Sequence, residues 1–171
     1  MKKFILCLSL TLPLFFFSCS SDDDENETVD IDSIEGTWES TSVSGNVTSS
    51  NTLATIALNL ALQQYASRQE PAAYVFYSDN TYESYIAQNE SYVYNDEGEY
   101  TLTTDSLIIN STNSGTREAY KLVAANSTAI KIKKNYLTDT SSWALDILSG
   151  YVGVEITEAT ATMTYQRESS N

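Results

Sequence analysis

Short stretches of alternating apolar and polar residues, separated by turn-forming residues at hairpin spacing, constrain the fold of this 171-residue chain most strongly. Tyrosine, threonine and serine are abundant in these stretches, and such residues favour twisted, half-exposed strands. We count eight or nine strands between Gly36 and Arg167. This spacing predicts an antiparallel up-and-down barrel or a sandwich, because each tight turn returns the chain beside the strand it has left.

The expected strands are joined by residues typical of tight turns. Ser78–Thr81 and Asn95–Gly98 combine asparagine and aspartate with small residues, and shorter turns are expected at 105–106 and 126–127. The expected strands span residues 36–43, 73–77, 82–87, 99–104, 107–110, 119–124, 128–134, 151–157 and 159–167, with a short continuation at 92–94.

Two stretches break the alternation. Thr52–Arg68 is rich in leucine and alanine, which favours a helix, and Ser50, Asn51 or Thr52 can cap its start. Its first half is apolar on nearly every side, so we expect burial on more than one face, as part of the core. A lid over a cavity and a docking surface for a partner are the alternatives. Ser141–Leu148 can form a second, short helix before the last hairpin.

The N-terminus has the features of an export signal. Lys2 and Lys3 precede an apolar run, Phe4–Phe17, that is shorter than the about 20 residues of a transmembrane helix. The following Ser18 and Cys19 complete a pattern that resembles a bacterial lipoprotein signal peptide. The resemblance implies cleavage before Cys19, lipidation of its sulfur and anchoring in the outer membrane. An ordinary secretory signal with a chance cysteine is the alternative.

An acidic stretch, Ser20–Asp32, follows the cysteine and predicts an extended, solvent-exposed tether, since like charges repel one another. Within it, Asp22–Glu25 resembles the surface-export tag of some Gram-negative lipoproteins, which implies display on the cell surface. An inward-facing protein is the alternative. A calcium loop is not expected, because four consecutive carboxylates lack the alternate spacing and the turn glycine of an EF-hand.

Four stretches resemble the bacterial lipocalin-like lipoprotein domains. Ile34–Trp38 resembles their opening Gly-x-Trp, and Phe76–Tyr82 resembles their phenylalanine strand and Ser-Asp-Gly-Thr turn, with Asn80 in place of the glycine. Gly98–Leu102 resembles their Gly-x-Tyr hairpin, and Thr162–Arg167 their closing strand. The resemblance implies a lipocalin-like barrel of about eight strands around a cavity, and no particular activity. The two helical insertions depart from the pattern of a simple member.

The chain is therefore expected to contain a signal peptide (1–18), a lipidated acidic tether (19–32), one lipocalin-like β-barrel domain (33–168) and a tail (169–171). Cys7 lies in the segment to be removed, so the mature chain would keep only Cys19 and form no disulfide. Stability must then come from an ordinary hydrophobic core, for which the remaining length is sufficient.

Charge and composition exclude several classes of function. A net charge of −14 opposes binding to nucleic acid and to anionic headgroups, and favours a cationic partner, although solubility alone also explains it. The chain has no histidine, and its one mature cysteine is expected to be lipidated. Histidine-dependent catalysis, histidine-based metal sites and thiol chemistry are thereby excluded. We expect no cofactor and no metal.

A pair of carboxylates could still act as in glycoside hydrolases. Glu39, Glu83 and Glu99 lie in expected strands, but each is opposite in phase to an aromatic neighbour such as Trp38. If the aromatic residues face inward, the three carboxylates face solvent. We therefore expect that the protein is not an enzyme.

The same alternation gives a set of inward-facing residues. Their functional interpretation is a cavity with apolar walls and phenol groups, and the alternative is a filled core, because an eight-stranded barrel is only just wide enough for one small ligand. Trp38 in particular is expected to close one end of the barrel. The candidates for ligand binding or core are Trp38, Tyr74, Phe76, Tyr82, Tyr100, Leu102, Tyr120, Met163 and Tyr165, and Leu107, Ile109, Leu122, Ile130 and Ile132 share their phase.

Two functions remain. The first is a non-catalytic, membrane-tethered binding module that holds a small apolar or amphipathic ligand in the barrel. The second is a protein-interaction module, such as an inhibitor of a cationic enzyme or an accessory subunit of an outer-membrane complex, which predicts an exposed apolar patch beside acidic residues. A surface-coat component is a third possibility.

Overall fold

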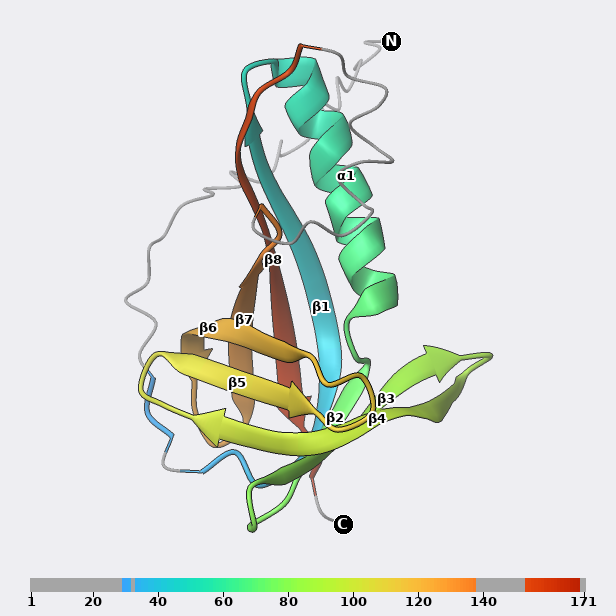
Figure 1. Cartoon of the computed structure of the whole chain (residues 1–171), viewed down its shortest axis with the longest axis vertical. Coiled ribbons are helices and arrows are strands. Elements are labelled where there is room, and N and C mark those ends of the chain that lie inside the picture. The colour runs from blue at the N-terminus through green and yellow to red at the C-terminus, as the bar shows by residue number, and fades with distance from the viewer. Residues whose placement is uncertain (1–28, 32, 138–152, 170–171) are drawn as a thin grey trace, which may run out of the picture.

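A computed structural model describes residues 29–31, 33–137 and 153–169. The chain forms a closed barrel of eight antiparallel strands, in which consecutive strands pair and the last strand pairs with the first. One helix follows the first strand (Figure 1). The predicted up-and-down barrel with this helical insertion is confirmed. The predicted signal peptide, the lipidated Cys19, most of the tether and the Ser141–Leu148 helix lie outside the described residues.

Most elements match their predicted positions to within a few residues, but the strands that begin at Gly36 and Ser91 are much longer than expected. The described elements are β1 Gly36–Ser49, α1 Thr52–Gln69, β2 Ala73–Phe76, β3 Thr81–Gln88, β4 Ser91–Leu102, β5 Ser106–Ser111, β6 Arg117–Ala125, β7 Ala129–Asn135 and β8 Ile156–Arg167.

The strand β4 is continuous, and the turn predicted at Asn95–Gly98 is wrong. The chain reverses instead at Asn89 and Glu90, which both have positive φ, as a two-residue hairpin turn requires. A β-bulge interrupts the pairing of β3 with β4. Gly98 allows a close backbone approach, because a Cβ there would lie 2.0 Å from the carbonyl oxygen of Asn110. The turn-forming residues of β4 therefore serve a bulge and a close contact.

The strands β1 and β8 run past the rest of the barrel as a two-stranded ribbon, and α1 lies along it (Figure 1). The prediction of two strands at 151–157 and 159–167 is wrong, because Ile156–Arg167 is one strand. Gly45 lies where α1 crosses β1, and a Cβ there would be 2.7 Å from the carbonyl oxygen of Asn59. This crossing explains why β1 continues through a glycine.

The helix α1 is capped as predicted, since the side chain of Asn51 accepts hydrogen bonds from the amides of Leu53 and Ala54. The prediction that it is buried on several faces is wrong. Leu53, Ile56 and Leu60 are 79%, 64% and 57% exposed. The buried residues form one stripe at every fourth position, facing the β1–β8 ribbon: Ala54, Leu58, Leu62 and Ala66.

The barrel interior is filled by the predicted inward-facing residues, all of which are buried except Leu102, which is partly buried. Trp38 is fully buried, and its Nε1 donates a hydrogen bond of 2.7 Å to the carbonyl oxygen of Ile34. The guanidinium of Arg167 stacks on its ring at 4.7 Å. These contacts tie the segment before β1 to the end of the barrel where β1 begins.

Candidate functional site at one end of the barrel

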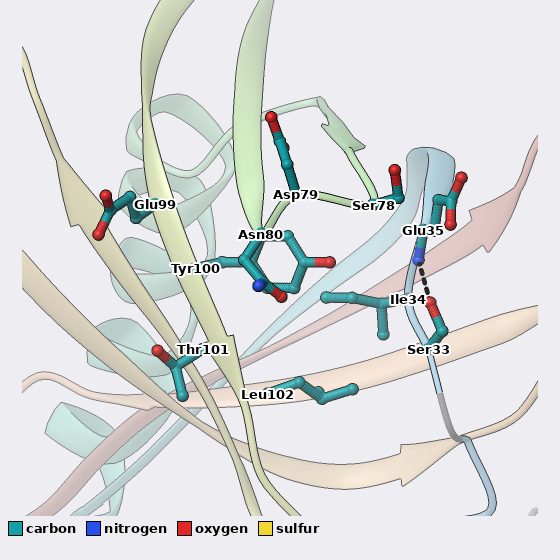
Figure 2. A pocket seen from close by; sticks show the side chains of 10 residues that line it. All are labelled: Ser33, Ile34, Glu35, Ser78, Asp79, Asn80, Glu99, Tyr100, Thr101 and Leu102. Atoms are coloured by element: carbon teal, nitrogen blue, oxygen red, sulfur yellow. Dashed lines mark hydrogen bonds between the residues drawn. The ribbon is translucent and has the colours of Figure 1, made fainter.

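The two ends of the barrel carry different hollows. One of them is a groove of about 610 Å³. It is lined by the segment before β1, by the turn between β2 and β3, and by the end of β4. Figure 2 shows Ile34 on one side of this groove and Tyr100 and Leu102 on the other, with Asp79 in the β2–β3 turn. The Asp79 carboxylate is occupied by its own turn, because it accepts hydrogen bonds from the amide and hydroxyl of Thr81. This groove is lined largely by residues of turns and of strand ends.

The hollow at the other end lies beside the last turn of α1, and we call it the α1-end pocket. It has a volume of about 380 Å³, within the usual range for small-molecule sites. Aromatic and apolar surface forms one part of its wall, and amides, hydroxyls and two carboxylates form the rest. Its lining residues are Gln69, Pro71, Tyr74, Tyr82, Ser84, Asn95, Asp96, Ile109, Ser111, Asn113, Ser114, Thr116 and Glu118.

Asp96 is held in the wall of this pocket by two hydrogen bonds. The hydroxyl of Tyr82 donates to Oδ2 at 2.7 Å, and the hydroxyl of Ser111 donates to Oδ1 at 2.9 Å. Burial, followed by this bond to Asp96, raises the pKa of Tyr82, so its hydroxyl remains a donor at neutral pH. Each carboxylate oxygen retains a free acceptor direction, because a carboxylate oxygen can accept two hydrogen bonds.

A buried carboxylate, Glu70, lies next to the pocket at the C-terminal cap of α1. Its Oε1 is 2.9 Å from Nζ of Lys134 and also accepts from the hydroxyl of Tyr136. Its Oε2 is 2.8 Å from the hydroxyl of Tyr120. Both oxygens of this buried carboxylate thus have polar partners, although the single hydroxyl hydrogen of Tyr120 is shared between Glu70 and Glu118.

Lys134 joins this buried group to the pocket wall, because its Nζ also lies 3.0 Å from Oε1 of Glu118. The same ammonium lies over the rings of Tyr120 and Tyr136, at 5.5 Å and 5.3 Å from their centroids. Burial opposes the charged form, but the carboxylates of Glu70 and Glu118 outweigh it and raise the pKa of Lys134. The cluster therefore keeps its ammonium at neutral pH.

The sequence-predicted candidates do not form a single site. Two of them, Tyr74 and Tyr82, line the α1-end pocket. Tyr120 takes part in the buried cluster, and the hydroxyl of Tyr165 donates to the carbonyl oxygen of Pro71 at 2.9 Å. The others lie elsewhere: Trp38, Phe76 and Met163 in the core, and Tyr100 and Leu102 along the groove at the opposite end.

Sequence reasoning missed the charged members of the site. Glu118 shares the inward phase of Tyr120, two positions later, and Lys134 shares the phase of Ile132. This alternation could have identified Glu118 and Lys134 as inward-facing residues, but charged residues were assumed to face solvent. Asp96 was assigned to a turn that does not exist. The carboxylates expected to face solvent, those of Glu39, Glu83 and Glu99, are all at least partly exposed.

The chemistry available here is hydrogen bonding and ion pairing. Among the described residues, no group of three or more carboxylates, histidines or cysteines is arranged to hold a metal ion. A search of the same residues for a helix long and apolar enough to cross a membrane finds none.

The architecture defines a class, that of eight-stranded antiparallel barrels of lipocalin-like shape. No protein-family model matches the chain, and no curated protein matches it.

Proposed function

We propose that this chain is a lipid-anchored, exported binding module that holds a small amphipathic ligand in the α1-end pocket. One observation carries the proposal: the rings of Tyr74 and Tyr82 and the carboxylates of Asp96 and Glu118 line the same hollow. Rings and carboxylates that converge on one pocket suit a molecule with an apolar body and a polar end.

The charge of the wall favours one kind of polar end. Asp96 and Glu118 are the charged residues of the lining, and Lys134, the cation that pairs with Glu118, is also engaged by Glu70. An anionic head such as a fatty-acid carboxylate would meet unfavourable charge here. A group that carries positive charge or donates hydrogen bonds would find free acceptors.

A non-catalytic role agrees with the same groups. The carboxylates near the pocket are fixed by tyrosine, serine or lysine donors, and the sequence supplies no histidine to move a proton near neutral pH. The location of the module remains a proposal from the sequence: a lipid on Cys19 and the acidic tether would hold it at the outer membrane.

Calorimetric titration of the full chain, purified in detergent, tests the ligand class. Hexylamine, hexanol and hexanoate share an apolar chain and differ only at the polar end. We expect hexylamine to bind most tightly and hexanoate least tightly. Asp96→Asn should weaken binding of hexylamine, whereas Asp105→Asn, which changes an exposed carboxylate in the β4–β5 turn, should leave it unchanged. Equal binding of all three probes, or no effect of Asp96→Asn, would contradict the proposal.

A further inference from the structure

The hairpin of β3 and β4 projects beyond the barrel (Figure 1). Tyr77 and Tyr94 are 40% and 47% exposed, and Tyr85 stands beside Tyr94 in an edge-to-face contact with centroids 6.2 Å apart. Glutamates share this face with the rings on both strands. We call the surface formed by Tyr77, Glu83, Tyr85, Tyr94, Glu97 and Glu99 the tyrosine–glutamate face.

Like charges oppose each other on this face. Glu83 pairs directly with Glu97 across the two strands, and Glu99 follows Glu97 on the same side of β4. Like charges directly opposite one another destabilise a β-sheet. The described ion pairs both involve Lys134, and no described lysine or arginine pairs with these three glutamates. The sheet therefore bears an electrostatic cost that no described lysine or arginine relieves.

The face is also hollowed. A groove of about 330 Å³ runs along it, and its walls include Tyr77 and all three glutamates. The hydroxyl of Tyr85 donates to Glu83, so one carboxylate of the groove wall is held in place by a neighbouring tyrosine. Exposed rings beside carboxylates attract a cation in two ways, through the faces of the rings and through the negative charge of the carboxylates. Tyrosine at an exposed site is also a residue that interfaces commonly use.

We infer that the tyrosine–glutamate face is a docking surface for a cationic, extended segment of a partner protein. Two lines of reasoning identify this occupant. Charge complementarity excludes an anionic membrane or nucleic acid and selects lysine or arginine side chains. The spacing of Glu97 and Glu99 on one side of a strand is about 7 Å, which matches alternate side chains of an extended partner. The face lies outside the α1-end pocket, so this inference does not depend on the proposed ligand.

A binding experiment with matched variants of the full chain tests this inference. The probe is a fluorescent, end-capped octapeptide of alternating lysine and threonine, followed by anisotropy at low salt, where the screening length is about 30 Å. Glu83→Gln with Glu97→Gln removes two charges from the face. Glu155→Gln with Glu158→Gln removes two charges at the far end of the β1–β8 ribbon and serves as the control.

We expect the first pair of substitutions to weaken peptide binding about fivefold or more, and the control pair to change it less than about twofold. Tyr94→Ala should also weaken binding, and added salt should weaken it in the unsubstituted chain. Because the first pair removes a repulsion, its melting temperature should not fall, so lost binding cannot be attributed to unfolding. Equal losses in both pairs would indicate attraction to net charge alone and would overturn the inference. So would the absence of binding to the unsubstituted chain.

Discussion

The Nζ of Lys134 lies 2.9 Å from Oε1 of Glu70, and the two side chains are only 15% and 3% exposed. This ion pair joins β7 to the residue that ends α1, across the end of the barrel. Charges removed from water are costly unless each has its partner. The pair therefore fixes where the helix ends relative to the α1-end pocket, and its loss should lower the free energy of unfolding.

Lys134→Met should lower the free energy of unfolding by about 3 kcal/mol, because it leaves Glu70 buried with only tyrosine hydroxyls as partners. Urea denaturation followed by circular dichroism measures the effect. The double variant Glu70→Leu with Lys134→Met removes both charges and should recover much of the loss. A loss below about 1 kcal/mol in the single variant, or an equal loss in the double variant, would contradict a buried, mutually dependent pair.

Stability should be constant near neutral pH and fall steeply above about pH 10. Burial raises the pKa of Tyr74, Tyr120 and Tyr165 well above the ordinary tyrosine value, so above that value these phenols stay neutral only in the folded chain. The raised pKa of Lys134 acts in the same direction. A folded-state pKa above the unfolded value gives stability that is complete below the unfolded pKa and is lost as pH rises.

Melting temperatures measured between neutral pH and pH 12, together with the absorbance of tyrosinate, check this expectation. The buried tyrosines should ionise only as the chain unfolds. Smooth ionisation of all tyrosines near their ordinary pKa, without a change in melting temperature, would show that these phenols are accessible.

Local signals in the sequence predicted local structure well. Asn51 caps α1, and Asn80 takes a positive φ in the β2–β3 turn, as the side-chain chemistry of asparagine allows. The inward phase was also correct, because alternation in a strand fixes which side chains share a face. These features depend on neighbours along the chain.

Features that depend on distant parts of the chain were misread. Gly98 was assigned to a turn, and the first strand was expected to end before Gly45, but each glycine permits a backbone approach that only the folded chain reveals. Glu118 and Lys134 follow the inward phase, and the burial of the Lys134 ammonium becomes understandable only with Glu70, which lies far away in sequence. The apolar composition of α1 likewise indicated burial on several faces, whereas only the face that packs on the β1–β8 ribbon is buried.

The two faces of α1 allow a matched comparison of identical substitutions. Leu62 is fully buried against the ribbon, whereas Leu60 is 57% exposed on the same helix. Leu62→Ala should cost about 3 kcal/mol through lost burial and the cavity that remains, and Leu60→Ala less than about 0.5 kcal/mol. Both changes have the same effect on helix propensity. Chemical denaturation of the two variants under the same conditions gives the difference, and similar losses would mean that the outer face of α1 is also packed.

Gly45 sets the distance between α1 and β1. A Cβ at this position would lie 2.7 Å from the carbonyl oxygen of Asn59 and 2.9 Å from the amide nitrogen of Gln63, and both are backbone atoms that cannot rotate away. Gly45→Ala should therefore push the helix off the ribbon and lower the free energy of unfolding by about 1–3 kcal/mol, despite the better strand propensity of alanine. Denaturation measures the loss, and hydrogen exchange should show faster exchange in α1 than in β4 and β5, which lie away from the contact. Ser44→Ala, on the neighbouring residue of β1, is the control and should have little effect. An unchanged or increased stability of Gly45→Ala would mean that the helix does not cross the strand at this residue.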